Sequence, residues 1–311
     1  MNNIRMKQHR KIRGKKNWGE ITYQVVCTVI VAVFALMCLY PLLYVVGISF
    51  TTQQEWAETG GKIFLFPSHP SFAAYTRVFK SGSDVLRALW VSVQRTVLGT
   101  VGGVIVAAVL GYVLSRKNLP GKGIITFLVL ITIFFSISSI PNFIVVRDLN
   151  LLNSLWSLVL PALLNTWYAL IFKQFFEGIP EEVEEAAHID GVSEFQLFYK
   201  IVLPMSGPVL AAIALFTMVA HWNAYFDVML YNREDKSWWT LQYYVKTQFD
   251  NSAQADQGDL GNWENIVGTK DDVALIAKQM ALTVVSLLPV LIAYPFFQKY
   301  FTKGVYMGAI K

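Results

Sequence analysis

Hydrophobic residues along this chain gather in long runs that are separated by shorter polar segments. Windows of about 20 predominantly apolar residues, the length at which a helix crosses a bilayer, occur six times. Their expected limits are 23–48, 88–115, 123–146, 153–176, 207–230 and 280–299. Internal prolines, at Pro41, Pro141, Pro161 and Pro289, do not exclude these windows, because neighbouring membrane helices satisfy the freed backbone groups. The pattern predicts an all-α integral membrane protein with six transmembrane helices.

One face of the second window consists of small residues. Gly99, Gly103, Ala107 and Gly111 recur at intervals of four, so a helix brings them to one side. Such a smooth face lets another backbone approach closely. We expect tight packing inside the subunit here rather than an interface with another subunit.

Composition and charge agree with a membrane protein. Of the 311 residues, 54% are hydrophobic and 15% are charged, whereas soluble domains carry about 25% charged residues. The formal charge is +5, and basic residues crowd positions 5–16, just before the first apolar window. Basic residues in that place set membrane orientation, and we favour this over a nucleic-acid patch. We expect a basic cytoplasmic segment at 1–22 and a transmembrane domain over 23–311.

The remaining loop charges predict the orientation of the spans. With the N-terminus inside, one short inner loop carries Arg116, Lys117 and Lys122, while a short outer connection has Arg147 directly before Asp148. Cytoplasmic loops are enriched in such bases. Both termini and the 173–206 segment are therefore expected on the cytoplasmic side.

The inner segment 173–206 is unusually acidic, with seven carboxylates against two lysines. Pro180 suits a first helical position, and the glutamates after it suit the positive end of the helix dipole. Gly191 can adopt positive φ and end this helix. Ser193 and Gln196 have the spacing of a capping box for a second helix, which Pro204 ends. Small alanine side chains make one side of this short helix narrow enough to lie in a groove on another protein. We therefore predict that the segment docks onto a partner.

The run Glu185-Ala186-Ala187-His188-Ile189-Asp190-Gly191, with Ile201, Leu203 and Pro204 after it, resembles the coupling motif of ABC importer permeases of the maltose-type carbohydrate family. The tail 294–311 is similar to the polysaccharide and oligosaccharide branch, whose transmembrane domain is MetI-like. The resemblance implies a coupling segment at 179–204 that contacts a separate ATPase. It assigns docking to Glu185, Ala186, Ala187, Asp190 and Gly191, and support to Ile201, Leu203 and Pro204.

The same resemblance implies the partners. It predicts a dimer of ABC ATPase subunits, a second homologous permease, an extracytoplasmic solute-binding protein and an oligosaccharide substrate, in the bacterial cytoplasmic membrane. A heterodimer of permeases is expected, although no residue excludes a homodimer. Transport would proceed by alternating access, and the chain would hold no cofactor because ATP is bound by the partner subunits.

Polar groups inside apolar spans are candidates for a substrate path. Arg95 lies in the second window, Asn165 in the fourth, and Trp222, Asn223 and Tyr225 in the fifth. Aromatic faces and planar polar groups suit sugars. Alternatively, Arg95 extends to the membrane interface and the aromatic residues form interfacial belts.

Two long outer loops are expected at 51–87 and 231–279. Loops of this length are commonly functional or disordered. In the second loop, 250–272 is polar and looks longer than is usual for the family. It suits either a docking surface for the binding protein or a mobile insertion.

The chain shows no motif for covalent chemistry. It contains no G-x-x-x-x-G-K-[ST] loop, no H-E-x-x-H and no G-x-S-x-G, and its four histidines lack metal-ligand spacing. We therefore expect no catalytic or metal-binding residues and a transport subunit rather than an enzyme. The alternatives are the same architecture with amino acids, peptides or small anions as cargo, a membrane-anchored scaffold, and an intramembrane hydrolase.

Overall fold

The computed structural model describes residues 18–61, 65–80, 83–135, 138–258 and 274–308. Within these ranges the chain is helical and forms no β-strand, which confirms the expected all-α class. Three helices are long and apolar enough to cross a membrane: α1 (Trp18–Ile48), α4 (Ser83–Ser115) and α16 (Leu275–Gly308). Up to six spans result if each of three bent helix pairs counts as one.

Two expected windows, 123–146 and 153–176, contain a break where the sequence predicted a continuous helix. A third break, at Ser206, lies just before the 207–230 window and close to the helix end predicted at Pro204, and that window is itself interrupted at Ala224 and Tyr225. The breaks separate α5 (Lys122–Phe134) from α6 (Ser139–Asp148), the turns α7 (Leu155–Val159) and η1 (Leu160–Ala162) from α8 (Thr166–Glu177), and α10 (Glu194–Leu197), η2 (Phe198–Val202) and α11 (Leu203–Met205) from α12 (Gly207–Asn223). The bends are 113°, 46° and 82°, respectively. Hydropathy could not indicate them, because a bent pair is as apolar as a straight helix.

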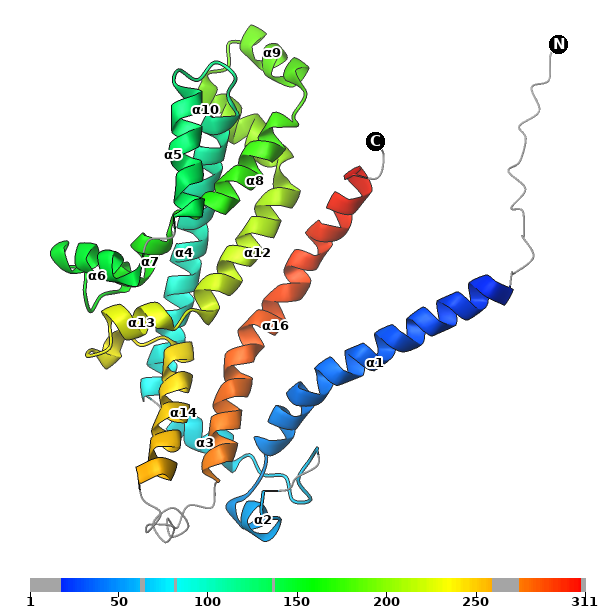
Figure 1. Ribbon diagram of the computed structural model, residues 1–311, viewed down its shortest axis with the longest axis vertical. Coiled ribbons are helices and arrows are strands. Elements are labelled where there is room, and N and C mark those ends of the chain that lie inside the picture. Colours follow the sequence, from blue (N-terminus) through cyan, green and yellow to red (C-terminus); the bar gives the residue numbers. More distant parts are fainter. Residues whose placement is uncertain (1–17, 62–64, 81–82, 136–137, 259–273, 309–311) are drawn as a thin grey trace.

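Helix α4 forms the centre of the molecule and packs most extensively against α8 and α12 (Figure 1). Its small residues permit this approach. A Cβ on Gly111 would lie 2.5 Å from the Cβ of Phe172, and one on Gly99 would lie 2.5 Å from the His221 ring. A Cβ on Gly103 would lie 3.3 Å from the methyl carbon of Thr217. The small face of α4 therefore packs inside the subunit, as predicted.

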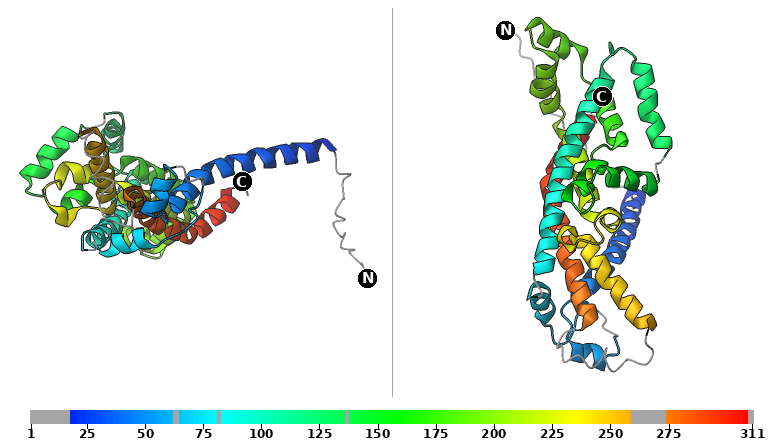
Figure 2. Two further views of the ribbon diagram at one scale, coloured as in Figure 1. Left: turned by 90° about the horizontal axis from the view of Figure 1, so that it is seen from below. Right: turned by 90° about the vertical axis from the view of Figure 1, so that its left-hand side faces the viewer.

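Helix α1 leans away from the rest of the molecule (Figures 1 and 2). Only Gly47 and Ile48, at its end, are buried. Its contacts are with α16. The long apolar surface that this leaves uncovered suits a lipid environment.

The two long connecting segments fold into helices at the end of the molecule opposite α9 (Glu181–Ile189) (Figure 1). The first contains α2 (Gln53–Glu58) and α3 (Ala73–Lys80), and the second contains η3 (Lys236–Trp238) and α14 (Leu241–Gly258). The short helix α13 (Phe226–Tyr231) precedes the second segment, beside the end of α12. Of the 250–272 loop, only the part up to Gly258 belongs to the described residues. Positions 1–17 of the basic segment and 309–311 of the tail also lie outside them.

Candidate coupling site and substrate path

Helix α9 is built by its end signals. Pro180 was expected at the first helical position, but it is the N-cap residue and α9 begins one position later, at Glu181. Acidic residues occupy the first turn, where they meet the positive end of the helix dipole. At the other end Gly191 adopts φ 75°. Its N–H donates to the His188 carbonyl at 3.0 Å, and the next N–H, of Val192, donates to Ala187 at 3.0 Å. This pair of bonds is a Schellman motif, so the predicted glycine stop is confirmed.

The following helix is capped as predicted. The Ser193 hydroxyl accepts from the Gln196 N–H at 3.4 Å, and the Gln196 side chain accepts from the Ser193 N–H at 3.3 Å. After α10 the chain passes through a π-helical turn, η2, into α11. At the bend before α12 the buried Ser206 hydroxyl donates to the Val202 carbonyl at 2.7 Å. A continuous hydrogen-bonded path therefore links α9 to α12.

Apolar packing holds this path against the centre of the molecule. Leu197 and Val202 are fully buried in a cluster with Phe172 and Phe176 of α8. Ile201 and Leu203, the expected support residues, pack against the same cluster, whereas Pro204 is exposed. Ala187 was assigned to docking, but it is only 5% exposed and belongs to the cluster. Its small side chain lets α9 lie close to the body, so it supports the docking surface from behind.

The outward face of α9 and α10 combines exposed polar and apolar groups. Glu185, Ala186 and Asp190 are exposed. Beside them Ile189 is 86% exposed and Phe195 is 74% exposed. The sequence analysis assigned neither Ile189 nor Phe195 to docking. The sequence feature that could have indicated Ile189 is its large aliphatic side chain between two polar residues, His188 and Asp190.

A row of ion pairs ties α9 to the loop between α4 and α5. Arg116 donates to both carboxylate oxygens of Glu184, at 2.6 and 3.0 Å. A second pair, Lys117–Glu181 at 2.7 Å, joins the same two elements. Next to them, Lys122 of α5 pairs with Glu177 of α8 at 3.4 Å.

These pairs change the expected role of the acidic residues. The hydrogen bond that Lys117 donates to the Glu181 carboxylate raises the pKa of this exposed lysine. Three carboxylates that the sequence offered to a partner are thus held by bases of this chain. Among the described residues, Glu185 forms no ion pair, so its carboxylate is available. A cleft of about 920 Å³ lies between this loop, α8 and α9.

A buried ion pair holds the opposite end of α12. The chain turns at Ala224 and Tyr225 before α13 begins. Arg95 of α4 donates to the Ala224 carbonyl at 2.9 Å and to both carboxylate oxygens of Asp227. Arg95 is 1% exposed. It therefore does not extend to the membrane interface, and it clamps the turn between α12 and α13.

The other candidates for a substrate path fall into two groups. Trp222 is buried, and its indole donates to the Ser286 carbonyl of α16 at 2.9 Å, so it joins two helices. Asn165 is exposed and its side chain caps α8. Asn223 and Tyr225 are exposed at the end of α12. The structure thus leaves Asn165, Asn223 and Tyr225 accessible and buries Arg95 and Trp222.

In the part of the chain that the structure describes, no three His, Cys, Asp or Glu residues group closely enough to hold a metal ion. The side chains of α9 and of the two ends of α12 form hydrogen bonds, ion pairs and apolar contacts with neighbouring helices.

Known proteins resemble the chain over most of its length. Residues 99–231 match the family described as "Binding-protein-dependent transport system inner membrane component". The polygalacturonan/rhamnogalacturonan transport system permease protein YtcP of Bacillus subtilis is 38% identical, over 89% of this chain and 94% of that protein. The arabinooligosaccharides transport system permease protein AraQ of Halalkalibacterium halodurans is 27% identical, over 90% and 94%.

A solved structure agrees with these sequence relatives. A chain of a bacterial ABC transporter involved in the import of the acidic polysaccharide alginate superimposes with a TM-score of 0.80 at 27% identity. The match covers 92% of this chain and 99% of that one.

Proposed function

The chain belongs to the family of inner membrane components of binding-protein-dependent transport systems, and from this premise we propose that it imports oligosaccharides as one of two permease subunits of a bacterial ABC importer. The relatives named above act on saccharides by their names, which favours this cargo over amino acids or peptides. The observation that carries the proposal is the exposed face of α9, which a short segment held by packing and local hydrogen bonds connects to α12.

The proposed topology has six spans, in which each bent helix pair counts as one, and both termini are cytoplasmic. This places α9 and the loop between α4 and α5 on the inner side. The bases of that loop follow the cytoplasmic bias for Lys and Arg. Their pairing with Glu181 and Glu184 supports placing α9 on the same side of the membrane.

We propose that α9 seats on an ABC ATPase subunit. Ile189 and Phe195 supply exposed apolar surface, and Glu185 supplies a carboxylate that forms no ion pair within the described part of the chain. Exposed apolar side chains beside polar groups are typical of protein interfaces. The Gly191 turn and the Ser193 capping box then transmit movement of α9 into α12.

The remaining partners follow from the proposed transport cycle. A solute-binding protein delivers the oligosaccharide to the outer side, and a second homologous permease completes the pathway. ATP binds to the ATPase dimer and the cavity then opens to the outer side. ATP hydrolysis returns it to the inward-facing state. This chain contributes packing and leverage and holds no cofactor.

Co-purification tests the assignment directly. We would purify the tagged chain gently from its native membrane and identify the retained proteins by mass spectrometry. The expected set is a P-loop ATPase, a second permease and a binding protein. Recovery of the chain alone, or with soluble enzymes only, would contradict the importer assignment and favour a scaffold or an enzyme.

A glycine pair supplies the matched variants. Gly191 has φ 75°, where a β-branched residue is strained, so Gly191→Val distorts the turn that ends α9. We expect loss of the ATPase from the purified complex or loss of sugar-stimulated ATP hydrolysis. Gly123 lies in open space at ordinary φ, so Gly123→Val should retain both. Normal stimulation of the Gly191→Val complex would contradict the role of this turn.

A further inference from the structure

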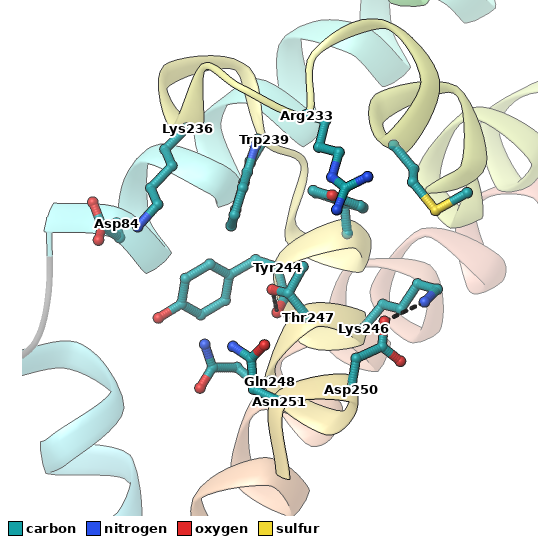
Figure 3. Close-up of a pocket in the computed structure, with 12 residues that line it drawn as sticks. Asp84, Arg233, Lys236, Trp239, Tyr244, Lys246, Thr247, Gln248, Asp250 and Asn251 are labelled. Carbon is teal, nitrogen blue, oxygen red and sulfur yellow. Dashed lines mark hydrogen bonds and ion pairs between the residues drawn. The ribbon is translucent and has the colours of Figure 1, made fainter. Parts of the chain in front are cut away.

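A polar pocket lies at the end of the molecule opposite α9. Its volume is about 500 Å³, and it is lined by the start of α4, the segment between α13 and α14, and one side of α14. Figure 3 shows Arg233, Lys236 and Trp239 along one end, Tyr244 in the middle, and Gln248 and Asn251 at the other end. No role has been given to this pocket above.

The charges that line the pocket do not cancel. Its acids are Asp84 and Asp250. Asp250 is paired with Lys246 inside the pocket, and Asp84 is 3.7 Å from Arg87, which does not line it. Arg233 and Lys236 are exposed and have no carboxylate partner among the described residues. Three bases and two acids line the pocket, so the lining carries a net charge of +1, and Arg233 and Lys236 are its bases without an ion pair among the described residues.

Groups that suit a sugar ring lie beside these charges. Lys236 sits 5.7 Å from the centre of the Trp239 ring, and Tyr243 and Tyr244 add further aromatic surface. Thr247 and Asn251 add a hydroxyl and an amide. Aromatic rings bury apolar surface while nearby polar groups fix orientation, which is the usual make-up of a ligand pocket. Arg forms charge-assisted, two-pronged hydrogen bonds with carboxylates.

The pocket adjoins the exposed residues at the end of α12. Lys246, which lines it, lies 5.9 Å from the centre of the Tyr225 ring. From the same helix, the Gln242 amide donates to the Asn223 side chain at 3.4 Å. A ligand in the pocket would thus be next to two of the accessible residues expected on a substrate path.

We propose that this pocket binds a carboxylate-bearing oligosaccharide, with Arg233 and Lys236 holding a uronic acid carboxylate and the aromatic side chains contacting the rings. The proposal rests on the function proposed above and adds two features to it. It specifies an acidic cargo, and it specifies a recognition site on this subunit. Recognition here is electrostatic, so it should weaken as ionic strength rises.

Direct binding tests the pocket without the binding protein. The probes are trigalacturonic acid and its fully methyl-esterified form, which has nearly the same shape but no charge. Each is titrated by saturation-transfer NMR against the purified permease and ATPase complex. We expect the acid to bind roughly 10-fold more tightly than the ester, the size of effect that charge-assisted hydrogen bonds produce. The Arg233→Gln/Lys236→Gln double variant should remove this preference.

A matched variant separates local from general charge effects. Lys80 of α3 is also exposed near the same end of the molecule but does not line the pocket. Lys80→Gln should keep the preference for the acid. The Arg233→Gln/Lys236→Gln double variant and Lys80→Gln should each leave the thermal unfolding temperature of the complex unchanged, which would show that the fold is retained.

The outcomes distinguish this proposal from the proposed function. Equal binding of acid and ester, or a preference that survives the double variant, would overturn the pocket assignment. If the double variant bound both probes normally but lost attachment of the binding protein, the pocket would be a docking surface, and the proposal would also be overturned. Oligosaccharide uptake by the reconstituted importer is measured separately, and its absence would overturn the proposed function instead.

Discussion

The two ends of α12 are held in different ways. At its start the chain bends by 82° at Ser206, and this joint is held by apolar packing of η2 and α10 and by short-range hydrogen bonds. At its other end the turn at Ala224 is held by Arg95, a charged residue of another helix that is 1% exposed. We call these the inner joint and the outer joint.

The difference indicates how a movement could pass along α12. The inner joint connects to α9 and consists of side chains that pack without strict direction. The outer joint fixes one carbonyl and one carboxylate by directed bonds from α4. Since α4 also packs along α12, the outer joint favours a fixed geometry, while the inner joint can adjust to the position of α9. Each joint makes a separate prediction.

The largest effect is expected at the outer joint, for Arg95→Leu. The change leaves the Asp227 carboxylate and the Ala224 carbonyl without their donor. Breaking a buried ion pair costs about 3–5 kcal/mol. Because the Asp227 side chain is 23% exposed, we expect about 3 kcal/mol, measured as a fall in thermal unfolding temperature in detergent.

A double-mutant cycle gives the control for this prediction. Arg95→Leu/Asp227→Leu removes both charges, so it should be less destabilised than Arg95→Leu alone. Arg147→Leu breaks an exposed pair with Asp148 and should be close to neutral. Equal effects of Arg95→Leu and Arg147→Leu would show that the outer joint carries no special stability.

The next effect is expected at the inner joint, for Leu197→Ala. Leu197 is fully buried between α10 and the centre of the molecule. Removing a buried leucine side chain costs about 2–5 kcal/mol, according to how far the cavity collapses. We expect the lower end, about 2 kcal/mol, because α10 is a single short turn that can move into the cavity. Because α9 and α12 are joined through this packing, sugar-stimulated ATP hydrolysis should fall as well.

An exposed apolar residue on the neighbouring surface is the comparison for Leu197. Phe195 is 74% exposed, so Phe195→Ala should leave stability nearly unchanged while weakening attachment of the ATPase. If Leu197→Ala lowered stability without any effect on ATP hydrolysis, the inner joint would be a packing contact only.

Local features of both joints could be predicted from the sequence, and tertiary ones could not. The Gly191 stop and the Ser193 capping box involve residues within five positions of each other, so their spacing is visible in the chain. Arg95 and Asp227 are 132 positions apart. Arg95 was noted as a polar group in an apolar window, but the sequence alone could not show that it meets Asp227.

Helix breaks and burial were missed for a related reason. Asn165 was expected on a substrate path, yet its side chain accepts from the N–H groups of Trp167 and Tyr168 and begins α8. Ala187 and Ala186 look equivalent as adjacent alanines, and only the position of Phe176 and its neighbours decides which one is buried. Composition predicts that these segments are helical and apolar, whereas the direction each side chain faces depends on the packing.

A smaller effect is expected for Arg116→Gln, which weakens the tie between α9 and the loop after α4. Arg116 bonds Glu184 with two prongs and lies 4.1 Å from the centre of the Tyr112 ring. Both partners are partly exposed, at 19% and 24%, so we expect roughly 1 kcal/mol. Arg116→Glu alone should also lower sugar-stimulated ATP hydrolysis, because it repels Glu184. Combining it with Glu184→Arg should recover part of that loss. No recovery would show that the pair does not position α9.

The smallest effect is expected for Lys117→Gln, because Lys117 and Glu181 are both exposed. Such pairs are weak and are screened by salt, so any effect on ATP hydrolysis should shrink as ionic strength rises. The hydrogen bond to Glu181 raises the pKa of Lys117 above its ordinary value. A raised lysine pKa stabilises the folded state below the unfolded pKa of about 10.4, and this contribution disappears as pH rises through the folded pKa. The difference between wild type and Lys117→Gln should therefore stay constant from about pH 7 to 9, and a steady decline across that range would contradict the pairing with Glu181.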